Sequence, residues 1–574
     1  MSDTGRLRTP DAARQTPANA GQVPAETAAG TPPETEDLYG AYPRLSAGQV
    51  ATLTSLGQRR PVEADETLIQ AGDLNCDFYV ILAGKAAVVE GRGSPFERLV
   101  SVHGQHRFLG ELGLLTGEAT FYSAVAVEPG EVLVVPVDQL RALVASDPDF
   151  GDLILRAFLI RRSILIGLGV GLRIVGSRYS ADARRLRDFA ARNRLPAQWL
   201  DVEEDRGAEA LLTQLGVPPQ DTPIVILYGQ RLLRNPSNAE LAAAIGLPTP
   251  SPPRGNCELL VVGSGPAGLS AAVYGASEGM ETVVLDGVAT GGQAALSSRI
   301  ENYLGFPSGL SGAELAVRAV IQARKFGAKF AVPAEAVSVV RDDGQFTVHL
   351  DDGAPMTGTS MVIATGARYR RLDVPRLEHF EKASVYYAAS QAEAMMCRGD
   401  PIVIVGGGNS AGQATVFLSR YASGVTLVVR EPDLSVSMSR YLIDQISRLG
   451  NVTILLGTQV QELIGDSVLE AVAVTDPGGQ RRVLDARALF IFIGMAPATS
   501  WLGDLVELDD HGFVRTGPDA RPAGTGWQAS ALETSQPGVF AVGDVRSGSA
   551  KRVATAVGEG AMAIRLAFQR MQSR

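Results

Sequence analysis

The chain has 574 residues, a net charge of −10 and an ordinary globular composition, with 45% hydrophobic and 20% charged residues. The length indicates several domains, and the acidic charge disfavours nucleic acid and anionic membranes as partners. Its three cysteines, Cys76, Cys257 and Cys397, are far apart, which argues against a disulfide framework and fits a cytoplasmic protein. No signal-peptide core occurs in residues 1–20, and we expect no metal site.

The N-terminal part divides into a tail and a strand-rich region. Residues 1–37 are rich in Ala, Pro, Thr and Gly and contain no aromatic residue, so we expect a disordered tail. Residues 38–165 show short strands and then a helical pattern from Asp138. One strand, 77–82, ends at a hairpin-type break at Ala83-Gly84 and is followed by a second strand at 86–89.

Region 38–165 resembles the cyclic nucleotide-binding domain family, which implies a jelly-roll-like β-barrel. The resemblance rests on Gly72-Asp73, Gly84 and the run Phe108-Leu-Gly110-Glu111. It implies that Glu111 takes a ribose hydroxyl, whereas the family's phosphate-binding arginine is missing, because 110–127 holds no Lys or Arg. A charge-assisted contact of about 1.5–3 kcal/mol is thereby lost. We expect the fold to persist and a cyclic nucleotide ligand to be lost or altered.

Residues 166–248 alternate strands and helices, with strands at 172–175 and 224–227 and a helix at 181–192. The segment resembles an α/β thioredoxin or glutaredoxin domain, with Thr222-Pro223 in the place of the family's cis-proline. The family's Cys-x-x-Cys position reads Ser180-Ala-Asp-Ala183, so this module can dock a partner but cannot carry electrons. We interpret Ser180 as a helix N-cap. A Pro-rich linker follows at 249–256.

Residues 257–574 contain two glycine-rich turns that each follow an apolar strand and open a helix. The first, Gly263-Ser-Gly265-Pro-Ala267-Gly268, is followed 18 residues later by Asp286 at a strand end. Glycines at this spacing let a pyrophosphate approach the helix N-terminus, and the acid can bind a ribose. The first turn therefore predicts a bound dinucleotide.

The same part of the chain resembles the low-molecular-weight thioredoxin reductase family, through Gly291-Gly292-Gln293, Ile300-Glu-Asn302-Tyr303, Ala364-Thr365-Gly366 and Val539 to Val545. The resemblance implies two α/β Rossmann-like domains, an FAD-binding domain of residues 257–371 and 498–574 and an NAD(P)H-binding domain of residues 372–497. It also implies a homodimer whose two nucleotide domains rotate relative to each other. Further FAD contacts are implied at Gly543, Asp544, Lys551, Arg552, Val553 and Ala554.

The second turn, Gly406-Gly-Gly408-Asn409-Ser410-Ala411, predicts the nicotinamide nucleotide site. Arg430 occupies the following strand end, where a cation can pair with a 2′-phosphate. NADPH is therefore favoured, with NADH as the alternative. Only one cation of the family's arginine pair remains, and Arg440 is a candidate substitute.

The family's redox Cys-x-x-Cys is missing. Tyr387 and Ser390 stand in its two positions, and hydroxyl groups cannot form a disulfide. Reduction of thioredoxin through a local dithiol is thus excluded on chemical grounds, and Cys397 is interpreted as structural. The sequence predicts an enzyme that passes electrons from NAD(P)H through FAD to an acceptor that it does not name: dioxygen, a quinone, a carrier protein or an oxidised thiol on another chain.

Two other readings stay open. The chain could be a flavin-containing redox sensor or scaffold without turnover, regulated through its N-terminal domain. A cyclic-nucleotide-responsive transcription regulator is disfavoured by the acidic charge and by the lack of a helix-turn-helix pattern after the barrel.

Overall fold

The computed structural model describes residues 32–37, 39–74, 76–111, 119–178, 180–247, 257–297, 300, 302–381, 384–387, 389, 393–394, 397–466, 468–521 and 529–572. The expected linker 249–256 and residues 1–31 of the expected tail lie outside these ranges. Within the described part, no helix has the length and apolarity needed to cross a membrane.

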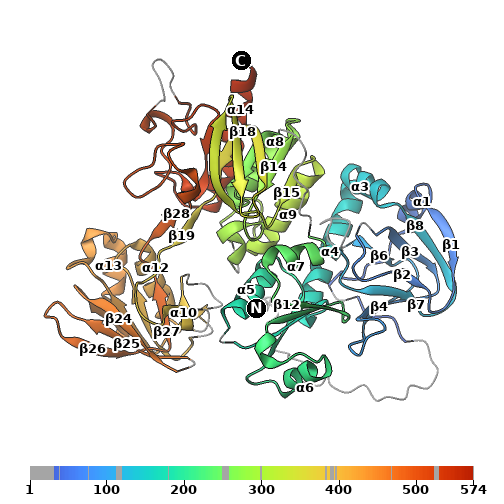
Figure 1. Ribbon diagram of the computed structural model, residues 1–574, viewed down its shortest axis with the longest axis horizontal. Coiled ribbons are helices and arrows are strands. Elements are labelled where there is room, and N and C mark those ends of the chain that lie inside the picture. The colour runs from blue at the N-terminus through green and yellow to red at the C-terminus, as the bar shows by residue number, and fades with distance from the viewer. Residues whose placement is uncertain are drawn as a thin grey trace, which may run out of the picture.

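Two four-stranded antiparallel sheets form the N-terminal barrel (blue in Figure 1), in the orders β1-β8-β3-β6 and β2-β7-β4-β5. Its elements are α1 (Ala47–Thr54), β1 (Gln58–Val62), β2 (Thr67–Ile69), β3 (Phe78–Ala83), β4 (Ala86–Glu90), β5 (Arg98–His103), β6 (Phe108–Leu109), β7 (Ser123–Ala126) and β8 (Gly130–Val135). Phe78, Phe108 and Leu133 are buried between the sheets. The jelly-roll-like expectation is confirmed.

Two expectations for this region are wrong. The break at Gly84 closes no hairpin, because β3 and β4 belong to different sheets and the chain crosses from one to the other. Residues 32–37 were assigned to the disordered tail, yet Thr35 pairs with the edge of β5. Its N–H donates to Val102 O at 3.0 Å, and its Oγ1 accepts from Val102 N at 2.8 Å. An open sheet edge provides backbone partners that composition does not reveal.

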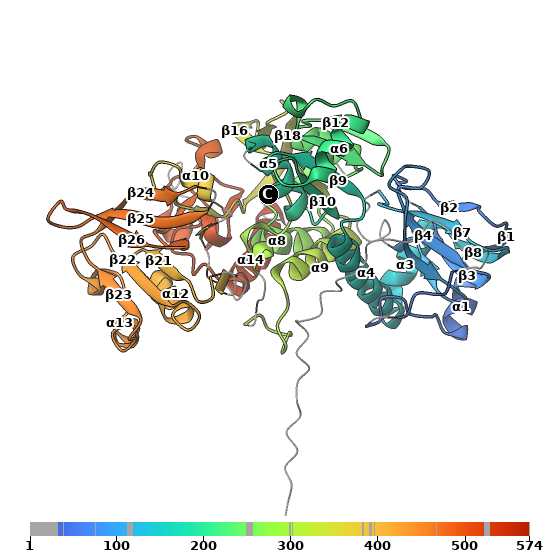
Figure 2. The ribbon, with the colours of Figure 1, turned by 90° about the horizontal axis from the view of Figure 1, so that it is seen from below.

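Two helices, α3 (Val137–Ser146) and α4 (Pro148–Leu168), lead out of the barrel. Asp147 caps α4 by accepting from Phe150 N–H, and Gly169 ends it in the left-handed conformation. Side chains Val317 and Ile321 of α9 (Gly312–Lys325) pack against the barrel core. Figure 2 shows α4 running from the barrel toward α9.

A second module, residues 172–244, has one four-stranded sheet in the order β10-β9-β11-β12, with β9 and β10 parallel and the other pairs antiparallel. Its elements are β9 (Leu172–Gly176), α5 (Ala181–Arg192), β10 (Ala197–Asp201), α6 (Arg206–Gln214), η1 (Pro219–Asp221), β11 (Ile224–Leu227), β12 (Arg231–Arg234) and α7 (Asn238–Ala244). The Thr222–Pro223 bond is cis, as predicted, and Ser180 caps α5 by accepting from Ala183 N–H. This α/β arrangement agrees with the expected thioredoxin-like module.

The sheet that carries the first glycine turn has the parallel core β15-β14-β13-β18, with β29 beside β18 and the antiparallel strands β17 and β16 continuing from it. Its elements are β13 (Cys257–Val262), α8 (Pro266–Ser277), β14 (Thr282–Leu285), η2 (Gly292–Leu296), α9, β15 (Lys329–Ala331), β16 (Ala336–Asp342), β17 (Gln345–Leu350), β18 (Pro355–Ile363), η4 (Ser500–Leu502), η5 (Gly517–Asp519), β29 (Val539–Ala541), η6 (Gly543–Val545) and α14 (Val553–Gln572).

The second glycine turn lies in a separate body, which the short strands β19 (Ala367–Tyr369) and β28 (Met495–Pro497) connect to the first (Figure 1). A parallel sheet, β20-β27-β21-β22-β23, packs beside the antiparallel sheet β24-β25-β26. The elements are α10 (Leu377–Phe380), β20 (Val385–Tyr386), β21 (Pro401–Val405), α12 (Asn409–Leu418), β22 (Gly424–Val428), η3 (Leu434–Val436), α13 (Arg440–Ile446), β23 (Val452–Leu455), β24 (Gln459–Gly465), β25 (Leu469–Thr475), β26 (Arg481–Asp485) and β27 (Ala488–Ile491).

Candidate functional site

The first glycine turn joins β13 to α8 and leaves open space at the helix N-terminus. Gly263 has φ +103°, and a Cβ there would lie 2.3 Å from Ala364 O, so only glycine fits. A Cβ on Gly265 would have no neighbour closer than 3.9 Å. Gly268 faces inward, because its Cβ would lie 1.8 Å from Gly263 O. The turn therefore has the shape that lets a diphosphate approach the N–H groups of α8.

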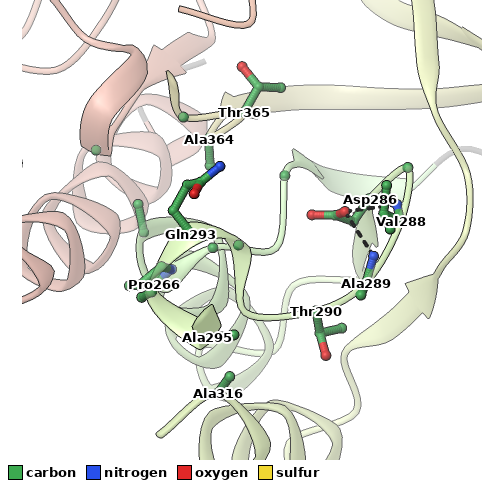
Figure 3. A pocket seen from close by; sticks show the side chains of 18 of the residues that line it. Pro266, Asp286, Val288, Ala289, Thr290, Gln293, Ala295, Ala316, Ala364 and Thr365 are labelled. Carbon is green, nitrogen blue, oxygen red and sulfur yellow. Dashed lines mark hydrogen bonds between the residues drawn. The ribbon is translucent and has the colours of Figure 1, made fainter. Parts of the chain in front are cut away.

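Asp286 follows β14 directly and braces this turn. Its Oδ2 accepts from the N–H and the Oγ of Ser264, at 2.9 and 2.8 Å, and its Oδ1 accepts from Val288 N–H at 3.1 Å. Figure 3 shows the carboxylate between the turn and the loop Val288-Ala289. Ala289 N–H also donates to Oδ1, at 3.4 Å, so a ribose hydroxyl would take the place of this longest contact among the roughly four acceptor sites of the carboxylate.

The turn opens into a cavity of about 650 Å³, within the range of roughly 300–1,000 Å³ that is usual for ligand sites. Most of the predicted FAD residues line it, namely Gly263, Gly265, Ala267, Asp286, Gly292, Gln293, Thr365, Gly366, Gly543, Asp544, Arg552 and Val553. In Figure 3, Gln293 points from η2 toward Ala364. Of the other predicted residues, Gly268 packs inside, and Asn302 and Ala554 are exposed outside the lining.

The end of the cavity opposite β14 carries an acid and a base. Burial raises the pKa of the Asp544 carboxyl. Lys551 donates from Nζ to the Asp544 carbonyl oxygen at 3.2 Å, and its ammonium lies 4.1 Å from the centroid of the Phe513 ring. Burial also lowers the pKa of Lys551. These groups give the cavity an acceptor for hydroxyl groups and a cation at the same end.

The second glycine turn repeats the geometry of the first. Gly406 has φ +141°, and its Cβ would lie 2.3 Å from Phe492 O, whereas a Cβ on Gly408 would touch nothing within 4 Å. Asn409, Ser410 and Ala411 form the start of α12, and Asn409 Oδ1 accepts from Ser439 N–H at 2.7 Å. The open Gly408 leaves room for a second diphosphate.

Two opposite charges follow β22, of which only Arg430 was expected to contact the nucleotide. Arg430 points outward, with 76% of its side chain exposed, and its Nη2 lies 3.3 Å from Glu431 Oε1. The Glu431 side chain is 29% exposed, and its Oε2 lies 3.0 Å from the point where a Cβ on Gly407 would stand. An acid at this place accepts from the ribose hydroxyls of NAD, so the strand end carries groups suited to both nucleotides.

Tyr387, which the resemblance places at the position of the first family cysteine, directly follows β20. Its ring stacks on Tyr369, a residue that lines the cavity at the first glycine turn, with ring centroids 5.8 Å apart. Its hydroxyl donates to Glu381 Oε1 at 2.6 Å, and Arg371 forms an ion pair with the same carboxylate. Burial and then the Glu381 contact raise the pKa of Tyr387. The second predicted position, Ser390, lies outside the described residues.

The three cysteines are all free and partly or fully buried. Burial raises the pKa of Cys76 and of Cys257 to about 12 and also raises the pKa of Cys397. The Cys397 thiol donates to Ala394 O at 3.7 Å. Because the thiolate is the reactive form, none of the three is poised for thiol–disulfide exchange.

In the barrel, the acid expected to bind a ribose is engaged by another part of the chain. Glu111 is fully buried, and its Oε1 lies 2.8 Å from Nη1 of Arg161 on α4. The Arg161 guanidinium is also buried and stacks over the Phe108 ring, with its Cζ 4.6 Å from the ring centroid. Thr120 and Tyr122, near the position of the missing family arginine, are buried and uncharged.

Sequence reasoning missed one part of the cavity lining, which comes from outside residues 257–574. The cavity at the first glycine turn is also lined by Arg162 of α4 and, at the end of α5, by Ala191, Arg192, Asn193 and Arg194. Asn193 Nδ2 donates to Val288 O at 3.1 Å, across 95 positions of sequence. No local pattern could have revealed a contact between such distant segments.

Comparison with known proteins agrees with this geometry. The family model for pyridine nucleotide-disulphide oxidoreductases matches residues 257–560, and that for the cyclic nucleotide-binding domain matches residues 59–147. A "34.2 kDa protein in rubredoxin operon" of Clostridium pasteurianum is 30% identical over 311 residues, covering 54% of this chain and 96% of that protein. Thioredoxin reductase of Treponema pallidum is 33% identical over 307 residues, covering 53% and 94%.

A solved structure, thioredoxin reductase of T. acidophilum, is 30% identical and covers 55% of this chain and 99% of that chain, with a TM-score of 0.46. The family match spans more than half of the chain and includes both glycine turns. The chain therefore belongs to the pyridine nucleotide-disulphide oxidoreductase family and has a thioredoxin-reductase-like flavin oxidoreductase part behind a cyclic nucleotide-binding domain.

Proposed function

We propose that the chain is an FAD-dependent NAD(P)H oxidoreductase that delivers electrons to an acceptor other than a dithiol of its own. The observation that carries this proposal is the dithiol position, where Tyr387 stacks beside the flavin cavity and no paired cysteine exists in the chain. The acceptor is then dioxygen, a quinone or an electron-carrier protein.

The residues of the large cavity fit FAD. The open turn at Gly265 suits a diphosphate, Asp286 suits the adenosine ribose, and Asp544 suits hydroxyl groups at the other end. FAD, when bound, accepts a hydride and can return electrons singly or in pairs. The chain's own part is to stack the nicotinamide against the flavin and to exclude water, which needs geometry rather than a titrating side chain.

We further propose that the nicotinamide site favours NADPH by a narrow margin. Arg430 can pair with the 2′-phosphate, whereas Glu431 can accept from the ribose hydroxyls of NADH. In Arg430→Ala, kcat/KM for NADPH should fall about tenfold while that for NADH changes little. In Glu431→Gln, kcat/KM for NADH should fall and the preference for NADPH should widen. Equal changes for both nucleotides in either variant would contradict these roles.

The function itself is tested by steady-state NADPH oxidation with a panel of acceptors. Ferricyanide, a soluble quinone and dioxygen should each be reduced over many turnovers, whereas a thioredoxin disulfide should not be. Flavin reduction by NADPH without turnover on any acceptor would favour the sensor reading. Rapid reduction of thioredoxin would overturn the proposal. The homodimer implied by the family resemblance is checked in the same preparation by light scattering.

A further inference from the structure

We propose that the N-terminal modules complete the FAD site, with the end of α5, residues 191–194, covering the adenosine half of the cofactor. This inference rests on the proposed binding of FAD. The residues concerned lie before residue 257, outside the segment that matches the family model. They thus add to a site that the family part builds from its own turn and strands.

The position of the α5 end along the cavity follows from its contact with the loop after Asp286. In this type of sheet the adenosine ribose lies at the acid after the second strand, and the pyrophosphate lies at the glycine turn. Asn193 donates to Val288 O at 3.1 Å, and Val288 N–H donates in turn to Asp286. The α5 end therefore lies against the adenosine half rather than the flavin ring.

A buried arginine holds the α5 end in place. Arg162 of α4 is 5% exposed, and its Nη2 donates to the carbonyl oxygens of Asn193 and Arg194 at 3.3 and 3.4 Å. A cation at a helix C-terminus is favoured by the helix dipole and by the unpaired carbonyl groups there. The chain leaves α5 through Arg194, which has φ +52°. The contact between α4 and α5 thus fixes the backbone that faces the cavity.

The charge of the added lining suits an anionic cofactor. Arg162, Arg192 and Arg194 from the N-terminal modules line the cavity together with Arg324 of α9. FAD brings a diphosphate, and arginine forms charge-assisted hydrogen bonds with phosphate oxygens. We assign Arg194 to the adenosine diphosphate part of FAD and Asn193 to positioning the loop that carries Val288.

The test is FAD binding to the full-length apoprotein, followed by quenching of flavin fluorescence. Arg194→Ala should raise the dissociation constant for FAD about tenfold, and Asn193→Ala should raise it about threefold. Binding of FMN, which lacks the adenosine half, should be the same in the variants and the wild type. Arg234→Ala is the matched control, because this exposed residue of the same module does not line the cavity.

Asp286→Ala separates FAD binding by residues 257–574 from the added contribution of the N-terminal modules. If Asp286→Ala loses FAD while Arg194→Ala and Asn193→Ala bind it like the wild type, the N-terminal modules add nothing and this inference is overturned. Equal loss of FAD and FMN, with a lowered melting temperature of the apoprotein, would mean a general folding defect and would also overturn it. A wild-type chain that binds no FAD would remove the proposed function itself.

Discussion

Gly263 and Gly265 lie two residues apart in the first glycine turn, yet the structure gives them different tasks. The backbone at Gly263 is left-handed and lies against Ala364 O, so this glycine shapes the turn. Gly265 has ordinary backbone angles, and the space where a side chain would stand is empty. A glycine here is therefore needed only to let a bound group approach the backbone. Sequence spacing predicts that both must be glycine but cannot separate these reasons.

The two alanine variants should therefore behave differently. Gly263→Ala should destabilise the apoprotein by about 1–3 kcal/mol, because it forces a strained backbone and a clash. Gly265→Ala should leave the apoprotein melting temperature unchanged and weaken FAD binding at least about tenfold. Apoprotein melting and FAD titration check both. A Gly265→Ala chain that binds FAD normally would place the diphosphate elsewhere.

At single residues, sequence prediction succeeded where the backbone alone decides. Asp286 lies at the end of β14, as its spacing from the first turn predicted, whereas the place of Tyr387 beside the flavin stays a prediction, which its stacking on Tyr369 supports. Glu431 was missed, because the direction of a side chain after a strand depends on its neighbours and not on spacing. The expected position of Asn302 in the site is not seen, since it lies outside the cavity lining.

Helix α5 and the residues that directly follow it contact three other parts of the chain. Near its start, Arg184 donates to the carbonyl oxygen of Glu378 in α10, at 2.7 Å. Just after its end, Asn193 donates to Val288 O in the loop that follows β14. Arg162 of α4 donates to the carbonyl oxygen of Asn193. Figures 1 and 2 both show the module of residues 172–244, to which α5 belongs, between the barrel and the body that carries the second glycine turn. Helix α5 thus links bodies that the family resemblance expects to rotate.

Arg184→Ala tests whether the contact between Arg184 and Glu378 O restrains the body that carries the second glycine turn. Losing a contact to one carbonyl group costs about 1 kcal/mol, so NADPH-dependent flavin reduction should speed up about threefold to fivefold in stopped flow. The dissociation constant for FAD should not change, since Arg184 does not line the cavity. An unchanged or slower reduction rate would show that the contact does not limit the motion.

Element bounds were predictable wherever local pattern and caps agree. The expected helix 181–192 and strand 224–227 match α5 and β11, because Ser180 and Pro223 mark their starts. The expected hairpin at Gly84 was wrong, because a turn residue shows that the chain reverses but not which strand it then pairs with. Strand pairing is a tertiary outcome, set by the two hydrophobic faces of the barrel.

In the whole molecule, a cyclic nucleotide-binding domain, the α/β module of residues 172–244 and a flavin oxidoreductase part are joined through contacts of helices α4 and α5. The barrel acid Glu111 is held by Arg161, next in sequence to the arginine that contacts the α5 end. The domain order was readable from motifs. The packing that joins the domains was not, since it depends on side chains far apart in sequence.

The engaged Glu111 predicts that the barrel does not bind cyclic nucleotides. Glu111 is fully buried and paired with Arg161, so a ribose hydroxyl could reach it only if this buried arrangement opened, and separating the ion pair costs about 3–5 kcal/mol. Titration calorimetry with cAMP and cGMP up to about 1 mM should show no binding. A dissociation constant in the micromolar range for either nucleotide would mean that Arg161 moves aside and that the barrel is a ligand sensor.

The central claim is that FAD is the only two-electron store of the chain. Anaerobic titration of the FAD-loaded protein with NADPH, followed by the flavin absorbance, measures this store directly. Because a disulfide takes up two further electrons, a chain with an active dithiol needs about two equivalents of NADPH per flavin. We predict complete bleaching at about one equivalent. An endpoint near two equivalents would reveal a second redox centre and contradict the account.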